Sequence, residues 1–461
     1  MIRKLLRRVF TRAKLTPAQA SIEHAVIAVK QHGIHREDIS PASRKVCSVL
    51  QEHGYKAYVV GGAVRDLIAG IKPKDFDVAT NATPDQVRDL FRRSRIIGRR
   101  FRIVHVMSGP ETIEVSTFRA MHSQETETDE HGRVLHDNVW GTIAEDATRR
   151  DFTVNALYYD PSDETVIDYH DGVADLKKKT MRVIGDPCQR YREDPIRMLR
   201  AVRLASKLDL VIDPATSKPI REMADLLENV PTARLFDEML KLLTSGHAVK
   251  CLKQLVAEGL HQGLLPMLDV ILDQPMGERF VWLSLENTDA RVRAGKPISV
   301  GFLFATLLWH EVLANWNSRL ANNEPSHPAL FSAMSEVLDT QAEKLAITRR
   351  ISSDITEIWA LQPRFEKRSG KAPYRLLEQQ RFRAGYDFLR LRAESGEIPM
   401  ALPDWWDRFA NVNTDERATM LEPESRDGAK KRRRRPRRKS TAEATASVAA
   451  ELDADNGGTP E

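Results

Sequence analysis

Two carboxylates stand two positions apart in the stretch Asp75-Phe76-Asp77. On a β-strand, residues two apart project to the same face, so Asp75 and Asp77 would point together while Phe76 turns into the core. Such oxygen ligands suit Mg²⁺, which takes a few carboxylates together with phosphate oxygens and water. Two metal ions about 4 Å apart can activate an attacking hydroxyl and stabilise a departing pyrophosphate. The pair therefore indicates metal-dependent nucleotidyl transfer, with Mn²⁺ as an alternative ion.

An Asp-x-Asp pair alone is more often a turn, a helix cap or a solvated strand edge, so its surroundings decide its meaning. Upstream, KAYVVGGAVRDLIAG (56–70) is an apolar run that reaches Gly61 and Gly62 and continues with helical character. This order lets backbone N–H groups approach phosphates at a helix N-terminus. An ordinary strand-turn-helix unit would show the same order.

Three further residues could contribute to such a site. Glu114, in an expected strand over 112–118, is a candidate third metal ligand, and an exposed cross-strand charge is the equal alternative. Asp194 and Arg197 stand three apart at an expected helix start, so both can reach one ligand edge. Aspartate can accept from the exocyclic amine of adenine while arginine donates to a ring nitrogen or a phosphate. A capped helix with a local salt bridge accounts for the same spacing.

The combination resembles the signature of the class II polymerase-β-like nucleotidyltransferases, the family of tRNA CCA-adding enzymes and bacterial poly(A) polymerases. The resemblance is strong over about residues 58–203 and extends to the remainder only in general character. It rests on segments that follow one another in family order: GGAVRD (61–66), DFD (75–77), RRDFTVNAL (149–157), DYHDGVADL (168–176) and REDPIRMLRAVR (192–203).

The resemblance implies that Asp75 and Asp77 are the catalytic, metal-binding pair and that Asp151 is a further active-site acid. Whether Asp151 contacts metal or ribose stays open, because a carboxylate can also accept from a 2′-hydroxyl. The resemblance also implies a set of nucleotide-binding residues: Gly61, Gly62, Arg65, Asp66, Arg149, Arg150, Asp194 and Arg197.

The segment GRRF (98–101) favours the poly(A) branch of the family, because CCA-adding relatives usually differ there. Chain length and a basic tail favour the same branch. We therefore predict template-independent addition of AMP from ATP to RNA 3′ ends, with release of pyrophosphate, a modification that promotes RNA turnover in the family. A tRNA CCA-adding enzyme is the first alternative. An RNA-binding protein that kept the fold but lost the chemistry is the second.

The net charge of +5 is unevenly distributed along the chain. Residues 430–439 (KKRRRRPRRK) contribute +9 and the first fourteen residues +6, which leaves −10 for the rest. A block of this kind binds polyanions by releasing counterions, without sequence preference. We expect RNA contact there, with a solvated tail as the alternative. The candidate residues are Lys430, Lys431, Arg432, Arg433, Arg434, Arg435, Arg437, Arg438 and Lys439.

The pattern of apolar residues predicts an α+β head with a mixed or antiparallel sheet, then an all-helical C-terminal half and a disordered basic tail. Strands are expected at 56–60, 102–107 and 112–118, and a capped helix after Thr83. Residues 121–138 are polar and predict a loop. The expected units are a basic extension (1–40), a catalytic head (41–189), a helical neck (190–290), a helical RNA-binding body (291–421) and the tail (422–461).

A chain of 461 residues exceeds the size of one core, so at least two domains are expected. Three cysteines are too few for a disulfide framework, which favours the reducing cytoplasm. Basic residues interrupt the apolar positions of the first fourteen residues, which excludes a signal or membrane span there. This stretch could form an amphipathic helix on a membrane surface or on RNA, or a solvated arm. We expect a monomer, and the sequence names no protein partner.

Overall fold

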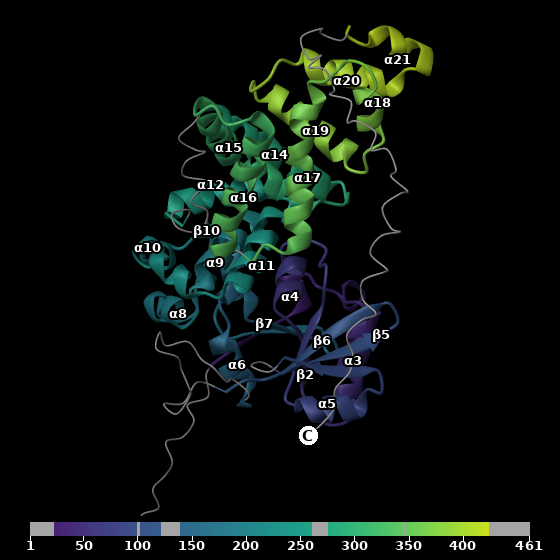
Figure 1. Ribbon diagram of the computed structural model, residues 1–461. Coiled ribbons are helices and arrows are strands. Elements are labelled where there is room, and N and C mark those ends of the chain that lie inside the picture. The colour runs from purple at the N-terminus through teal and green to yellow at the C-terminus, as the bar shows by residue number, and fades with distance from the viewer. Residues whose placement is uncertain (1–22, 99–101, 121–138, 261–274, 345, 424–461) are drawn as a thin grey trace, which may run out of the picture.

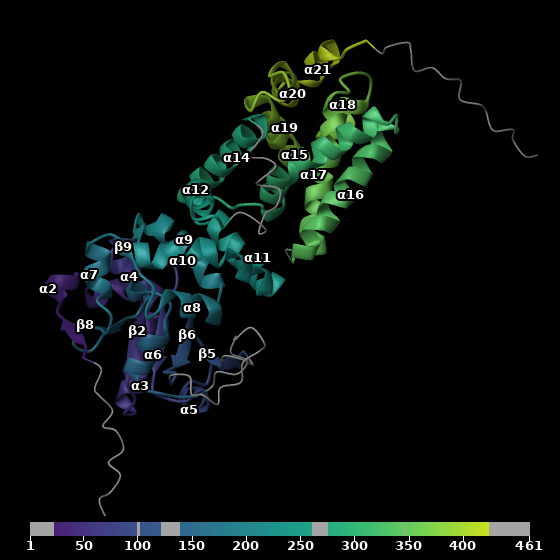
Figure 2. The same ribbon diagram turned by 90° about the vertical axis from the view of Figure 1, so that its left-hand side faces the viewer.

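A mixed sheet with its helices, here called the head, occupies one end of the molecule, and a stack of helices extends away from it (Figures 1 and 2). The computed structural model describes residues 23–98, 102–120, 139–260, 275–344 and 346–423. Several predicted features lie outside these ranges. They are the basic first fourteen residues, residues 99–101 of the GRRF segment, the expected loop at 121–138 and the nine basic residues of the tail.

Eight strands of the described chain form one sheet in the order β1-β8-β7-β2-β3-β6-β5-β4. Neighbours β3 and β6 run parallel, and the other neighbours run antiparallel. The predicted mixed sheet is therefore confirmed. The strands are β1 (Ala25–Ile27), β2 (Ala57–Val60), β3 (Asp77–Thr80), β4 (Ser94–Ile97), β5 (Ile103–Ser108), β6 (Glu111–Thr117), β7 (Leu157–Asp160) and β8 (Thr165–Asp168).

The first strand lies within the segment that we expected to be a basic extension. Residues Ala25 to Ile27 pair with Val166 to Asp168 of β8, far along the chain. Sequence patterns identify strands but not their distant partners, so the sheet begins before residue 41, where we expected the head to start.

The helix after Thr83 begins as its sequence predicts. The Thr83 side chain accepts from the Gln86 backbone N–H, and the Gln86 side chain accepts from the Thr83 backbone N–H. This reciprocal capping satisfies two backbone donors that a helix start leaves open. The helix α5 (Pro84–Leu90) then buries Val87. Local chemistry alone therefore determines where this element starts.

The strand that carries the two carboxylates begins later than expected. β3 starts at Asp77, so Asp75 lies just before the strand rather than on it. Phe76 is partly buried against the core, as predicted. Because Asp75 lies outside the ladder, its position depends on the loop that precedes β3 and not on strand alternation.

Short helices surround the sheet, and α3 packs across β2, β3 and β6. Those of the head are α2 (Val29–His32), α3 (Pro41–Glu52), α4 (Gly62–Ile68), α5, α6 (Ile143–Arg149) and α7 (Gly172–Lys177), with 3-10 turns η1 (Arg36–Asp38) and η2 (Thr153–Asn155). Next come α8 (Pro187–Glu193), α9 (Ile196–Leu208), α10 (Pro214–Glu222), η3 (Ala224–Asn229), α11 (Thr232–Leu243) and α12 (Ala248–Glu258).

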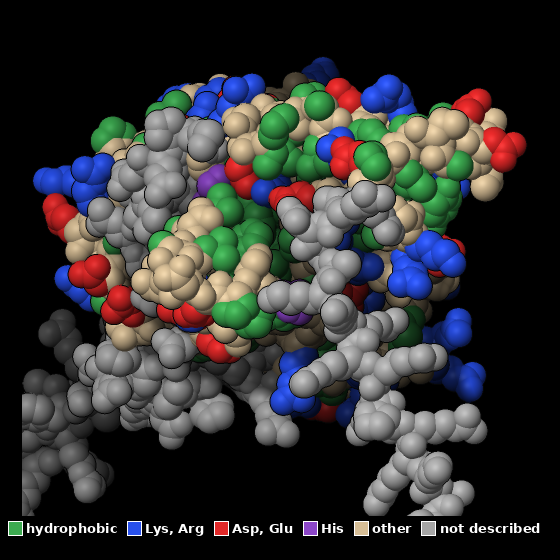
Figure 3. Space-filling model, turned by 45° about the horizontal axis from the view of Figure 1, so that its top comes forward, with side chains coloured by type: hydrophobic (Ala, Val, Ile, Leu, Met, Phe, Trp, Pro, Cys, Tyr) green, Lys and Arg blue, Asp and Glu red, His purple; other side chains and the backbone are tan. Residues whose placement is uncertain are grey.

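The stack continues with helices of varied length, among which tryptophan side chains are buried. Trp309 and Trp359 are fully buried with ring centroids 6.5 Å apart, and they join α15 to α17. With the top of the molecule turned forward, Figure 3 shows hydrophobic side chains in a hollow that charged side chains border. The elements are α14 (Pro275–Arg293), α15 (Val300–Ala321), α16 (Ser326–Lys344), α17 (Arg349–Phe365), α18 (Ala372–Leu377), α19 (Phe382–Glu394), α20 (Ala401–Asn411) and α21 (Thr414–Met420).

One short strand pair departs from the expected all-helical half. β10 (Val211–Ile212) follows α9 and pairs in parallel with β9 (Thr180–Met181) of the head. Two residues are too few to produce a period in the sequence. Within the described residues, no helix has both the length and the apolar character needed to cross a bilayer.

The glycine of the DYHDGVADL segment is required by packing. A Cβ on Gly172 would overlap the backbone carbonyl of Thr153 in η2. We predict that Gly172→Ala lowers the free energy of unfolding by about 3 kcal/mol, since a backbone cannot yield as a side chain can. Gly54→Ala, where a Cβ meets nothing within 4 Å, is the control and carries only the penalty of its positive φ, about 1 kcal/mol. Equal losses in urea unfolding would contradict this account.

Candidate active site

A cleft of about 940 Å³ between the head and α9 brings the predicted residues together. Glu114 is the exception among those that the structure describes. The predicted residues that line the cleft are Gly61, Gly62, Arg65, Asp66, Asp75, Asp77, Arg149, Arg150, Asp151, Asp194 and Arg197. The head supplies one wall and the α8–α9 region the other. Segments far apart in the sequence therefore converge on one cavity.

The turn after β2 owes its form to Gly61. Its φ of 69° lies in the region that favours glycine, and a Cβ there would lie 3.2 Å from Nη1 of Arg150. The missing side chain lets Arg150 lie directly on the turn. Gly62 then begins α4, so the predicted order of strand, glycines and helix is present.

Asp75 and Asp77 add negative charge to the cleft. Desolvation there, together with Glu114 and Asp75, raises the pKa of Asp77 to about 6, and Arg150 opposes the rise. A cation bound at the pair would relieve this repulsion, so the residues fit a divalent metal. Among the described residues, no group of three His, Cys, Asp or Glu side chains converges to hold a metal by itself. Phosphate oxygens and water would have to complete the coordination.

Glu114 lies beside Asp77 in the parallel pairing of β3 and β6. Its Oε1 atom is 3.3 Å from Nε2 of His105 on the neighbouring strand, and about half of its side chain is exposed. This arrangement agrees with the alternative interpretation of Glu114 as an exposed cross-strand charge. The position next to Asp77 keeps the metal-ligand assignment as a prediction.

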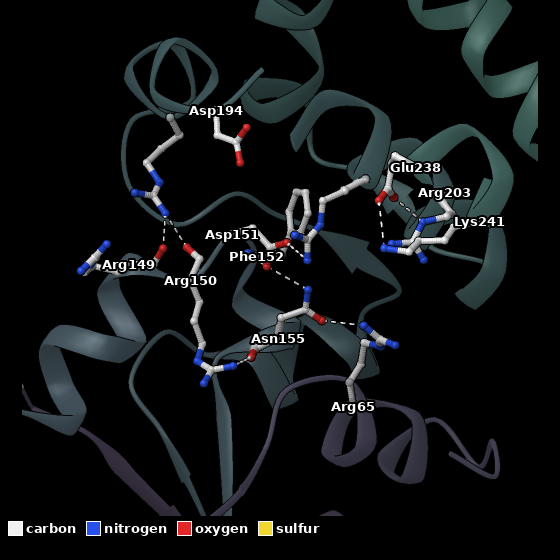
Figure 4. Close-up of polar contacts among 12 residues, drawn as sticks. Arg65, Arg149, Arg150, Asp151, Phe152, Asn155, Asp194, Arg203, Glu238 and Lys241 are labelled. Atoms are coloured by element: carbon white, nitrogen blue, oxygen red, sulfur yellow. Dashed lines mark hydrogen bonds and ion pairs between the residues drawn. The ribbon is translucent and has the colours of Figure 1, made fainter. Parts of the chain in front are cut away.

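Asp151 is buried, with hydrogen bonds to its Oδ1 atom and an ion pair at its Oδ2 atom (Figure 4). The backbone N–H of Phe152 and the amide of Asn155 donate to Oδ1, each at 2.9 Å, and Nη2 of Arg200 lies 2.7 Å from Oδ2. Burial works against the charged form, but Arg200, Asn155 and Arg197 outweigh it and lower the pKa of Asp151. The carboxylate is therefore charged at neutral pH.

Arg150 is held against the head by charge and by an aromatic ring. Its guanidinium donates to Oδ2 of Asp146 at 3.1 Å and to the Tyr158 hydroxyl at 2.9 Å. It also lies over the Tyr158 ring, 5.0 Å from the centroid. Desolvation opposes the cation, yet Tyr158 and Asp146 raise its pKa overall. Arg150 thus presents a fixed positive charge beside the carboxylates.

Arg190 of α8 joins the two walls of the cleft. Its Nη2 atom donates to the backbone carbonyls of Arg149 and Arg150, at 2.7 and 2.6 Å (Figure 4). Its Nη1 atom donates to Glu193 at 2.7 Å. The RRD segment of the head is therefore tied to α8 through its main chain.

Asp194 and Arg197 both face the cleft, but they do not form the local salt bridge that their spacing allows. Nη2 of Arg234 donates to Oδ2 of Asp194 at 3.0 Å, whereas Arg197 donates to Oε2 of Glu193, also at 3.0 Å. Oδ1 of Asp194 is buried and has no hydrogen-bond partner. Asp194 lies in the extended break between α8 and α9. An acceptor and a donor therefore stand ready at one end of the cleft.

Sequence reasoning missed Asn155 and Lys207, which also line the cleft. Asn155 follows Asp151 by four positions within RRDFTVNAL, and its amide connects Asp151 to Arg65 (Figure 4). Lys207 follows Arg200 by seven positions, the spacing of one helix face. That spacing predicts that Lys207 shares a helix face with Arg200, but it does not predict which residue Lys207 contacts across the cleft.

Three segments match known families. Residues 57–182 match the "Poly A polymerase head domain", residues 209–272 the "Probable RNA and SrmB- binding site of polymerase A" and residues 322–439 the "Polymerase A arginine-rich C-terminus". The chain is 44% identical to Poly(A) polymerase I of Haemophilus influenzae over 448 residues, which cover 93% of this chain and 98% of that protein. The chain belongs to the poly(A) polymerase family. A relative from Escherichia coli O6:H1 is also 44% identical, over 95% of this chain and 97% of its own.

CCA-adding enzymes share less of the chain with this member of the poly(A) polymerase family. The enzyme of Levilactobacillus brevis is 41% identical over 220 residues, 48% of this chain and 54% of its own. The Bacillus stearothermophilus CCA-adding enzyme in complex with CTP has a TM-score of 0.54 at 26% identity, covering 83% of each chain. The Thermotoga maritima CCA-adding enzyme complexed with tRNA has a TM-score of 0.56 at 20% identity, covering 87% of this chain and 91% of its own. The fold is therefore common to both branches.

The electrostatics of Asp77 predict a pH-dependent stability. Its pKa of about 6 in the folded chain exceeds the ordinary value of 3.8, so stability falls as pH rises through this window. In metal-free protein, Asp77→Asn should raise the melting temperature more at about pH 7.5 than at about pH 4.5. The carboxylate still reaches solvent along the cleft, and screening keeps the gain to a few degrees.

Differential scanning calorimetry in a chelator measures this gain. The control is Asp89→Asn, whose side chain is 73% exposed on α5. If Asp77→Asn gives the same gain at both pH values, the charge account of Asp77 is wrong.

Proposed function

We propose that this chain adds AMP from ATP to RNA 3′ ends without a template and releases pyrophosphate. The strongest support is its similarity to Poly(A) polymerase I over nearly the full length of both chains. The cleft supports the same chemistry, since it places acidic residues opposite a basic helix face. The three free cysteines, Cys47, Cys188 and Cys251, accord with action in the cytoplasm.

In this proposal Asp75 and Asp77 hold Mg²⁺, or Mn²⁺ in its place, and Glu114 is a further candidate ligand. When bound, the metal lowers the pKa of the attacking hydroxyl and neutralises charge on the leaving pyrophosphate. Arg150 contributes a fixed cation beside the carboxylates, where phosphate charge would gather. No covalent intermediate is required, because alignment of hydroxyl and phosphate suffices.

Asp151 acts through its neighbours rather than as a metal ligand. Its Oδ1 atom accepts from Asn155 and its Oδ2 atom faces Arg200, so a metal would have to displace Arg200. In this role Asp151 keeps the Arg200 cation at the cleft wall. In this proposal the hydrogen-bond donors around Asp151 contact the ribose, and Arg149 and Arg150 face the phosphates.

Recognition of the base edge is assigned to Asp194 and Arg197. The unpartnered Oδ1 atom of Asp194 can accept from the exocyclic amine of adenine. Arg197 is anchored by Glu193 and by the Arg190 carbonyl, which leaves its remaining N–H groups to donate to a ring nitrogen. Cytosine presents the same edge, an exocyclic amine beside an accepting ring nitrogen, so these two contacts exclude guanine and uracil, and the choice of adenine over cytosine depends on where the base is held.

An assay with single nucleotides tests the proposal. Purified chain is given each NTP separately with Mg²⁺, and either unstructured RNA or tRNA lacking its 3′ end. Long tails from ATP alone support adenylate addition. Incorporation of CTP onto tRNA would instead identify a CCA-adding enzyme. No incorporation under any condition would favour a binding protein without chemistry.

The metal assignment makes a direct prediction. Asp75→Ala should reduce adenylate addition by orders of magnitude, because the cation loses one of its two carboxylates. Asp75 is exposed before β3, so the melting temperature should stay near that of wild type. Primer-extension gels and calorimetry on the same preparation measure both quantities. An active Asp75→Ala variant would refute the metal site.

The basic tail has a separate prediction. Removing residues 430–461, which include all nine candidate RNA-binding residues, should weaken primer binding and flatten its salt dependence. The rate at saturating primer should not change, since the cleft is intact. Binding isotherms at several salt concentrations give the slope. A slope equal to that of the full chain would make the tail a solvated segment.

A further inference from the structure

Helix α9 presents a row of cations to the cleft, and each has an acidic partner on a different element. Arg197, Arg200, Arg203 and Lys207 recur at helical spacing, and all of them line the cavity. Their partners are Glu193 of α8, Asp151 of the head, Glu238 of α11 and Asp66 of α4. Two of the four pairs therefore cross from α9 to the head.

The first crossing pair joins the far end of α9 to the glycine-rich segment. Nζ of Lys207 lies 2.7 Å from Oδ2 of Asp66. The other oxygen of Asp66 accepts from Nε and Nη2 of Arg65, at 2.8 and 2.6 Å. Side-chain exposure is only 7% for both Arg65 and Asp66. These charges are buried, so they need one another.

The second crossing pair completes a closed ring. Nη1 of Arg65 donates to Oδ1 of Asn155 at 2.6 Å, and Nδ2 of Asn155 donates to Oδ1 of Asp151 at 2.9 Å (Figure 4). Asp151 then pairs with Arg200 at 2.7 Å, and α9 itself closes the circuit back to Lys207. Removing any one member would take one partner away from a buried charge or amide.

The ring attaches α9 to the head at two points. Arg200 and Lys207 are seven residues apart, about two helical turns or 10 Å along the axis. Together with the pairing of β9 and β10 and the contacts of Arg190, the two bridges fix the rotation of the helix as well as its distance from the head. Arg197 lies in the first turn of α9, and Asp194 lies two residues before the helix, with Pro195 between them. The orientation of α9 therefore sets where Arg197, and the adjoining Asp194, lie relative to the head.

We propose that Lys207 is a positioning residue for nucleotide choice, which acts through the ring by holding α9 at a fixed angle to the head. The angle places a purine between Asp194 and Arg197 while its α-phosphate lies beside Asp75 and Asp77. This inference rests on the proposed function. It also assigns Arg65 and Asp66 to the ring rather than to direct phosphate contact.

Kinetics of Lys207→Met test the role, because methionine keeps an apolar stem of similar length and removes the charge. We expect kcat/KM for ATP to fall on the order of tenfold, as for a misplacement below 1 Å, and preference for ATP over CTP to fall with it. Lys207→Arg should restore both. The control is Lys250→Met, which breaks an exposed pair with Asp209 at 2.9 Å on the outer surface. It should leave both quantities unchanged.

A double-mutant cycle separates positioning from direct phosphate binding. If Lys207 acts through the ring, Asp66→Asn alone reproduces the loss of preference, and the double variant with Lys207→Met is no worse than either single variant. If Lys207 instead grips the triphosphate, losses add and inorganic triphosphate binds more weakly to Lys207→Met. Additive losses would overturn the proposal. A lower melting temperature with preference unchanged would overturn it too.

A distance measurement tests the ring without reference to activity. Spin labels at Lys45→Cys on α3 and Glu222→Cys on α10, in a Cys188→Ser chain, report how the head and neck helices are placed. Electron resonance should give one narrow distance that broadens in Lys207→Met and not in Lys250→Met. An unchanged distance distribution in Lys207→Met would refute the proposed role of the ring. Broadening in a chain that adenylates no RNA would leave the ring standing and refute only the proposed function.

Discussion

The ion pair between Asp151 and Arg200 joins the two walls of the cleft, and the rest of the site depends on it. A buried carboxylate must be paired or neutral, and here Arg200 keeps it charged. The same pair anchors α9 beside the head, while separate acidic partners offset the repulsion among the other cations of that helix. Asn155 extends the contact to Arg65, so a single electrostatic requirement propagates through the motif residues of the head. The positions of these side chains in the cleft therefore follow from the need to pair each buried charge.

Charge is also divided between the walls in a way that suits a nucleoside triphosphate. The head side holds Asp75 and Asp77, where desolvation and neighbouring carboxylates raise the pKa of Asp77 to about 6 and a cation is favoured. The opposite side holds the cations of α9, each already paired with an acid. A cation paired with an acid can still donate through its remaining N–H groups, but the neighbouring negative charge weakens its attraction for an anion. Such a site can bind phosphate chains and release pyrophosphate.

The fold by itself does not separate the two branches of the family. Solved CCA-adding enzymes share it with TM-scores of 0.54 and 0.56, although the identities are low. A fold carries a function only through its site. What separates this chain is its sequence: Poly(A) polymerase I of Haemophilus influenzae matches 93% of it, whereas the CCA-adding enzyme of Levilactobacillus brevis matches 48%. Selection between adenine and cytosine must then arise from small differences in how the neck is held.

The sequence by itself indicated the chemistry, because that depends on the local spacing of the carboxylates and the paired glycines. Local spacing of capping residues likewise indicated where a helix starts. It predicted the capped start of α5 and the mixed sheet, and it named eleven cleft residues that the structure brings together. Only the tertiary structure decided which partner each charge takes. Asp194 turns to Arg234 instead of Arg197, and Lys207 reaches Asp66 across 141 positions of chain. Spacing along a helix shows which residues share a face, but partners across a cleft depend on packing between distant segments.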